Sequence, residues 1–231
     1  MKPQFIILSG PNGAGKSIFG RLHVPEGTPI FNGDLVFAEL IRQHPHIEAD
    51  RLSGGVAVAL EKARDQAISD KSNFAFESNF SNDMAIDISN MFSNAGYETS
   101  LVYFGLNDLE NSALRVDTRV RLGGHDVPLE VIRFNMEEGI KRVAANLSIF
   151  DKISFVDTSV KDMAPIIAYF IKETGTYVIL AENVRWFNES FREPLHKHSL
   201  IIHGALLEKL KENIKEVKRE KDEDNDWRIG R

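Results

Sequence analysis

The sequence predicts an α/β fold in which a mostly parallel sheet carries helices on both faces. Short apolar runs alternate with stretches of helical periodicity along most of the 231 residues. Helices that alternate with strands act as crossover connections, and crossovers place successive strands in parallel. The first apolar run, "FIIL", is continuous and ends at a glycine turn, as a buried strand does.

The remaining elements follow from the same two periodicities. We expect strands at residues 4–9, 28–34, 73–78, 99–106 and 152–157, and a β-hairpin around a Thr-Gly turn at 166–180. We expect helices from about residue 16, at 34–44, 55–69 and 84–95, from 109 to 121, from 128 to about 147, and at 206–217. Asp34 is predicted to cap the second of these helices.

The bulk composition is that of an ordinary globular protein. Apolar residues make up 42% and charged residues 27%. A net charge of -6 gives no overall attraction to nucleic acid or to an anionic membrane. There is no cysteine, no targeting segment is recognised, and the longest apolar run, "APIIAYFI", is far below a membrane span. We expect one cytoplasmic domain over residues 1–231.

The stretch "GPNGAGKS" matches the phosphate-binding pattern G-x-x-x-x-G-K-[ST] in full. Its glycines let the backbone N–H groups turn towards phosphates. Lys16 would reach the β- and γ-phosphates, and the Ser17 hydroxyl would bind Mg²⁺. The strand before it and the helix after it supply the context that the motif requires. The candidate nucleotide-binding residues here are Gly10, Asn12, Gly13, Ala14, Gly15, Lys16, Ser17 and Ile18.

Two acidic residues stand where the second and third strands end. Asp34 could accept the proton of a phosphoryl acceptor, or it could simply cap its helix. Glu77 could hold the Mg²⁺ shell, grip a substrate hydroxyl, or lie in solvent at the strand end. Position alone leaves these alternatives open.

Arginines cluster around a glycine break. Arg115 and Arg119 share one helix face, Arg121 precedes "LGGHDVP", and Arg133 follows it. The two helices, at about 109–147, could form a lid that brings guanidinium groups onto the moving phosphoryl group. The alternative is a solvated basic face paired with Asp117 and Glu130.

Taken together, these segments resemble the zeta-toxin family of P-loop kinases, which includes UDP-N-acetylglucosamine kinases. The segments are "GPNGAGKS", "FNGDLVFAEL", "NFAFES", "GYETSLVYFGL", "ALRVDTRVRLGGHDVPLEVIRF" and "FVDTS", and they span roughly residues 4 to 160. The arginine/Gly-Gly-His/Val-Pro run discriminates best, because a P-loop alone occurs in many NTPases. The C-terminal hairpin and helix, at about 164–221, carry less of the resemblance.

The resemblance implies a nucleotide-kinase-like fold and γ-phosphoryl transfer from ATP with Mg²⁺. It implies that Lys16 and Ser17 serve the phosphates and the metal, that Asp34 is the base, and that Glu77 holds the acceptor. Arg115, Arg119 and Arg133 would be the phosphate-directed arginines, and Asp157 would lie near the adenine. The chain departs from the family at Ile18, where Thr is frequent. It also departs at Glu77-Ser78-Asn79, where many relatives have Glu-Thr, and this change places Asn79 in the acceptor pocket.

Three functions follow for testing. The first is an ATP- and Mg²⁺-dependent kinase acting on a hydroxyl of a small molecule, with a UDP-amino sugar as a candidate and an antitoxin-like inhibitor as a candidate partner. The second is a nucleotide-dependent interaction module that docks a partner through the apolar stripe at 206–217, although a stripe of this kind is more typical of a helix packed on its own sheet. The third is a polynucleotide 5′-hydroxyl kinase, against which the net charge and the lack of a basic-aromatic groove argue.

Overall fold

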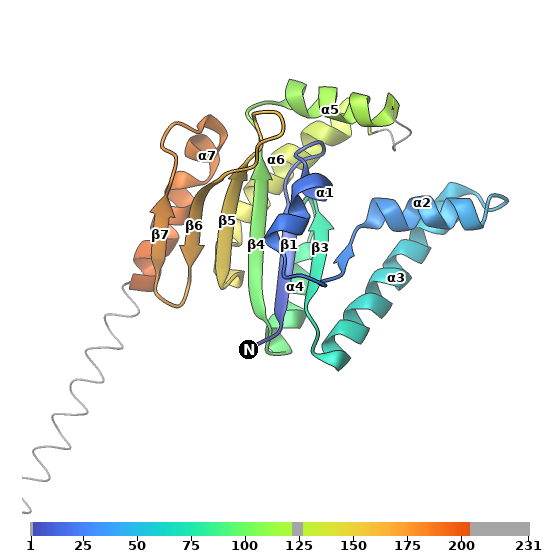
Figure 1. Ribbon diagram of the computed structural model, residues 1–231, viewed down its shortest axis with the longest axis horizontal. Helices are drawn as coiled ribbons and strands as arrows, with labels where there is room; N and C mark the ends of the chain where they lie inside the picture. The colour runs from blue at the N-terminus through green and yellow to red at the C-terminus, as the bar shows by residue number, and fades with distance from the viewer. Residues whose placement is uncertain (1, 122–126, 204–231) are drawn as a thin grey trace, which may run out of the picture.

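A computed structural model describes residues 2–121 and 127–203 (Figure 1). Seven strands form one sheet in the order β2-β3-β1-β4-β5-β6-β7. The strands are β1 (Gln4–Ser9), β2 (Ile30–Phe31), β3 (Phe74–Ser78), β4 (Glu98–Gly105), β5 (Lys152–Asp157), β6 (Ile166–Ile171) and β7 (Thr176–Ile179). The first five pair in parallel, and β6 and β7 form an antiparallel hairpin at the edge. The predicted mostly parallel sheet and its terminal hairpin are confirmed.

The helices fall where the sequence places them, with additions near the C-terminus. They are α1 (Lys16–Phe19), α2 (Gly33–Gln43), α3 (Ala49–Asp70), α4 (Met84–Asn94), α5 (Leu109–Arg121), α6 (Leu129–Ala145) and α7 (Arg185–Ser190), with 3-10 turns η1 (Gly20–His23) and η2 (Leu147–Ile149). Residues 192–203 are also helical, and the helix predicted at 206–217 lies outside the described residues. In the described ranges, no helix combines the length and apolar character that a bilayer crossing requires.

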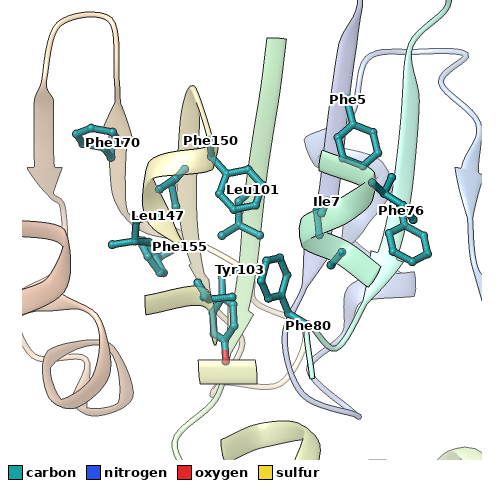
Figure 2. Packing of buried hydrophobic residues seen from close by; sticks show 14 of the residues in the cluster. Phe5, Ile7, Phe76, Phe80, Leu101, Tyr103, Leu147, Phe150, Phe155 and Phe170 are labelled. Atoms are coloured by element: carbon teal, nitrogen blue, oxygen red, sulfur yellow. The ribbon is translucent and has the colours of Figure 1, made fainter. Parts of the chain in front are cut away.

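Helices cover both faces of the sheet, but unequally. On β1, Phe5 and Ile7 point into the larger apolar cluster, which α3, α4, α6 and α7 cover. Figure 2 shows Phe5, Ile7 and Leu101 in that layer, with Phe150 and Phe155 further along the sheet. Ile6 and Leu8 point to a smaller cluster on the other face, completed by residues of α1 and the segment after it. The alternation arises because successive strand side chains point to opposite faces.

The carboxyl ends of the parallel strands meet at one edge, where α1 and α5 also lie (Figure 1). The register brings Ser9 at the end of β1 level with Ser78 of β3 and with Tyr103 of β4. Ligands bind open α/β sheets at this edge. The loops that follow β1, β2, β3 and β5 therefore converge on one region.

Gly105, the last residue of β4, lies against the Trp186 indole, so a side chain at this position should destabilise the fold. A Cβ at Gly105 would lie 2.4 Å from two indole carbons of Trp186. We expect Gly105→Ala to lower the free energy of unfolding by about 1–3 kcal/mol because the indole must shift. Urea unfolding measures this.

Gly54 is the matched control for this substitution. It lies inside α3, and a Cβ there would meet nothing within 4 Å. Gly54→Ala is expected to stabilise the protein by about 0.5–1 kcal/mol. Equal stability of the Gly105→Ala protein and the wild type would contradict the packing described for Trp186.

Candidate functional site

The phosphate-binding loop occupies the turn between β1 and α1, and three of its glycines adopt conformations that other residues rarely adopt. Gly10, Gly13 and Gly15 have φ angles of 136°, 73° and 78°. A Cβ at Gly10 would lie 2.1 Å from the Phe104 carbonyl oxygen, and one at Gly13 would lie 2.7 Å from the Ser112 carbonyl oxygen. Both the backbone angles and the tight surroundings therefore require glycine. Because α1 has only four residues, its dipole is weaker than that of a full-length helix.

The Lys16 side chain folds back over the loop. Its Nζ donates hydrogen bonds to the carbonyl oxygens of Gly10 (2.6 Å) and Pro11 (3.0 Å) and to Oδ1 of Asn79 (2.8 Å). The ammonium group is thus held at the centre of the loop by oxygen acceptors. A phosphate oxygen is an acceptor of the same kind with a stronger charge.

Ser17, Glu77 and Asn32 form a second contact group beside the loop. Oε2 of Glu77 accepts hydrogen bonds from the Ser17 hydroxyl (2.9 Å) and from Nδ2 of Asn32 (2.8 Å). Glu77 comes from the end of β3 and Asn32 from the residue after β2. The contacts therefore join the ends of two strands to the first turn of α1.

The prediction that Asp34 caps α2 is wrong, because Asn32 is the N-cap. Oδ1 of Asn32 accepts hydrogen bonds from the backbone N–H groups of Asp34 (3.0 Å) and Leu35 (3.2 Å). The strand ends at Phe31, earlier than expected, so the helix also begins earlier and Asp34 lies in its first turn. Asp34 is exposed there and its carboxylate is not used for capping.

Glu77 and Asp34 lie close enough to influence each other electrostatically. Burial raises the pKa of Glu77, and the negative charge of Asp34 adds to this effect. The Ser17 hydrogen bond, the positive charge of Lys16 and the Asn32 hydrogen bond act in the opposite direction. Glu77 is at the end of β3 and Asp34 follows the end of β2, and both strands run parallel to β1, so the two acids lie at the same edge of the sheet as the phosphate-binding loop.

The predicted lid corresponds to α5 and α6, which contact each other. Arg115 of α5 donates to the carbonyl oxygens of Thr158 (2.6 Å) and Gly13 (3.4 Å), so it bridges the end of β5 and the loop. Arg121 pairs with Asp117 on the surface at 2.7 Å, as the solvated alternative predicted. Arg133 of α6 is exposed. The Arg119 side chain and the break at residues 122–126, with its Gly-Gly-His sequence, lie outside the described residues.

The remaining predicted residues differ in burial and in their contacts. Oδ1 of Asp157, at the end of β5, accepts hydrogen bonds from Nε1 of Trp186 (2.9 Å) and from the Ser159 hydroxyl (2.6 Å). Asn12 and Ala14 are buried within the loop, whereas Ile18 is 76% exposed. Asn79 was expected in the acceptor pocket, and its side chain contacts Lys16 and Asn12 on the loop side.

Sequence reasoning assigned no role to Asn32. A polar residue placed directly between a strand and a helix is an N-cap signal, so its capping contact was readable. Its second contact, with Glu77, joins residues 45 positions apart and leaves no local signal. Among the described residues, no group of three or more His, Cys, Asp or Glu side chains could hold a metal ion.

Comparison with known proteins identifies the family. The family model described as zeta toxin matches residues 1–173 of the chain. The chain belongs to the zeta toxin family. With its P-loop kinase fold, this membership makes the chain a phosphotransferase of the kinase class. An uncharacterized protein of Haemophilus influenzae is 26% identical over 134 residues, which are 58% of this chain and 93% of that protein.

Solved structures support the same fold. A chain of the PezAT toxin-antitoxin system of Streptococcus pneumoniae is similar with a TM-score of 0.53 and 21% identity, and the match covers 68% of each chain. A chain of the AvrRxo1-ORF1:AvrRxo1-ORF2 complex, determined with ATP, is similar with a TM-score of 0.61 and 16% identity. That match covers 82% of this zeta toxin-family chain and 63% of the other, so the chain spans less than two thirds of that relative.

Proposed function

We propose that this protein is a Mg²⁺-dependent kinase that transfers the γ-phosphoryl group of ATP to a hydroxyl of a small molecule. The observation that carries the proposal is the contact of Glu77 with Ser17 and Asn32, which joins Glu77 to the phosphate-binding loop and to the N-cap of the helix whose first turn holds Asp34. A nucleotide-binding module that only signals would not need a second acidic site there. The sugar of a UDP-N-acetyl amino sugar is our first candidate for the acceptor.

The transfer step assigns a role to each acid. The acceptor hydroxyl would lie between Asp34 and Glu77. Its oxygen bonds to the γ-phosphorus as the bond from that phosphorus to the β–γ bridging oxygen breaks, and ADP leaves. The hydroxyl proton passes to the Asp34 carboxylate. This carboxylate is exposed and does not cap α2, because Asn32 is the N-cap.

The oxygen donors at the loop fit a magnesium ion. The Ser17 hydroxyl and Oε2 of Glu77 are 2.9 Å apart, and Mg²⁺ is commonly held by one or two such groups together with substrate phosphates and water. When bound, the ion neutralises negative charge on the phosphates. We propose that Ser17 would be its direct ligand and that Glu77, in contact with Ser17, would lie next to the ion.

The lid arginines complete the proposal. Arg115 donates to the carbonyl oxygens of Gly13 and Thr158, and we propose that it contacts the nucleotide beside the loop. Arg119 and Arg133 are proposed to reach the transferred phosphoryl group when the lid, at about 109–147, closes and excludes water. Asp157 is proposed to border the nucleotide base. We propose that the whole chain acts as one cytoplasmic domain. Its similarity to a chain of the PezAT toxin-antitoxin system suggests an inhibitor protein as a partner.

A labelled-phosphate experiment tests the function. The protein is incubated with Mg²⁺ and γ-labelled ATP, separately with UDP-N-acetylglucosamine, with a panel of small alcohols, and with an oligonucleotide that has a 5′-hydroxyl. We expect label in a small organic product. Label found only in inorganic phosphate would contradict transfer. Label in the oligonucleotide would replace the small-molecule acceptor with a polynucleotide, a substrate that the net charge of -6 disfavours.

A further inference from the structure

Three asparagine side chains meet where the phosphate-binding loop, the segment after β3 and helix α6 come together. Nδ2 of Asn135, on α6, donates a hydrogen bond to Oδ1 of Asn12 in the loop at 2.9 Å. Nδ2 of Asn79 donates to the same oxygen at 3.4 Å, and Oδ1 of Asn79 accepts from Nζ of Lys16. The amides therefore link α6 to the loop lysine through two intermediate side chains.

The backbone around these amides is packed too closely for the contact to be incidental. Gly139 lies one turn after Asn135 on α6, and a Cβ there would lie 2.4 Å from the Asn79 carbonyl oxygen. Phe80 follows Asn79 with a φ of 59°, which is rare for a residue with a side chain, and its ring is fully buried against Phe150. The buried ring holds the strained backbone, and the strained backbone fixes where Asn79 lies.

Asn12 is held by both lid helices. Its carbonyl oxygen accepts a hydrogen bond from the Ser112 hydroxyl of α5, and Ser112 is fully buried. Its side-chain oxygen accepts from Asn135 of α6. Asn12 itself is only 8% exposed, so losing a partner would leave a polar atom with little access to water. The position of α6 and the shape of the loop are thus coupled at a single residue.

We propose that Asn135 is a positioning residue that couples the lid helix α6 to the phosphate-binding loop through Asn12. The inference rests on the proposed function for its effect on turnover, because α6 also carries Arg133, two residues before Asn135. Its effect on nucleotide binding does not depend on any acceptor. The residue was not recognised from the sequence because its partner lies 123 positions away.

A double-mutant cycle tests the coupling. Asn12→Ala, Asn135→Ala and the double variant of the full chain are compared with the wild type in MgATP affinity, measured by calorimetry. We expect Asn135→Ala to raise the dissociation constant about 3- to 10-fold, as the loss of one hydrogen bond does. Because both substitutions remove the same contact, the dissociation constant of the double variant should lie within about twofold of that of the single variant that binds MgATP less tightly. Additive effects would overturn the proposal.

Two further variants separate positioning from packing. Asn146→Ala is the matched control, since Asn146 is the C-cap of α6 and its side chain donates to the Arg142 carbonyl oxygen of the same helix. It should leave MgATP affinity unchanged. Asn135→Asp keeps the shape, removes the donor and adds a negative charge, so it should bind MgATP no better than Asn135→Ala. Wild-type affinity in Asn135→Asp would overturn the proposal even if the alanine variant were unstable.

Turnover distinguishes this inference from the proposed function. If the wild type transfers phosphate, Asn135→Ala should lower kcat as well as MgATP affinity, whereas Asn146→Ala should lower neither. An unchanged kcat would overturn the link from Asn135 to the lid arginines. If the wild type transfers no phosphate to any acceptor but the cycle shows coupling, the proposed function fails and the coupling stands.

Discussion

Replacing Asp34 with asparagine is expected to lower phosphoryl transfer by about 10²- to 10⁴-fold, the usual contribution of a general base. The amide keeps the size of the carboxylate but cannot take the acceptor proton. MgATP affinity should stay nearly unchanged, because the described contacts of the phosphate-binding loop do not include the Asp34 side chain. The measurement is transfer of labelled phosphate at saturating ATP, with calorimetry for affinity.

Asp50→Asn is the matched control, since Asp50 lies in the first turn of α3 as Asp34 does in α2. A negative charge in a first turn stabilises a helix by about 0.3–1 kcal/mol, so both variants should lose a similar small amount of stability. Only Asp34→Asn should lose transfer. Wild-type turnover in Asp34→Asn would remove Asp34 as the base, and equal losses in both variants would point to a stability effect.

The fold was readable from the sequence where patterns are local. The strands β1, β3 and β4 contain continuous apolar runs that end at polar or glycine residues, β5 has the sequence KISFVD, and each was placed within a residue or two. The segment 185–203 was missed although Phe187, Phe191 and Leu195 repeat every four residues and are fully buried. That spacing is typical of a helix face, so the signal was present and was overlooked.

The site was only partly readable, for a physical reason. The phosphate-binding loop is a contiguous motif, because three glycines within six residues shape one turn. The cap of α2 was misassigned because "FNGD" holds two residues that can cap, and where the strand stops decides between them. The contacts of Asn79, Asn32 and Asn135 join segments far apart in the chain, and no periodicity encodes such pairings.

Replacing Lys16 with methionine is expected to lower transfer by about 10²- to 10³-fold, the effect of removing one preorganised donor that faces developing charge. The Lys16 ammonium is the group that the loop carbonyls of Gly10 and Pro11 hold in place. Methionine fills much of the same volume without charge or donor, so the β- and γ-phosphates would lose their cation. MgATP affinity should fall as well, in contrast to Asp34→Asn. The Lys16 ammonium would contact the phosphates already in the bound nucleotide, before transfer begins.

Lys152→Met controls for the loss of a lysine. Lys152 pairs with Glu98 at 2.8 Å at the other end of β5, and its removal should change neither affinity nor turnover. Asn79 adds a second comparison, since its Oδ1 accepts a hydrogen bond from the Lys16 ammonium and comes from a different strand end. If Asn79 orients the Lys16 side chain, Asn79→Ala should lower phosphoryl transfer by about 3- to 10-fold, less than Lys16→Met does. A Lys16→Met protein that binds and transfers like the wild type would show that the Lys16 ammonium does not serve the triphosphate.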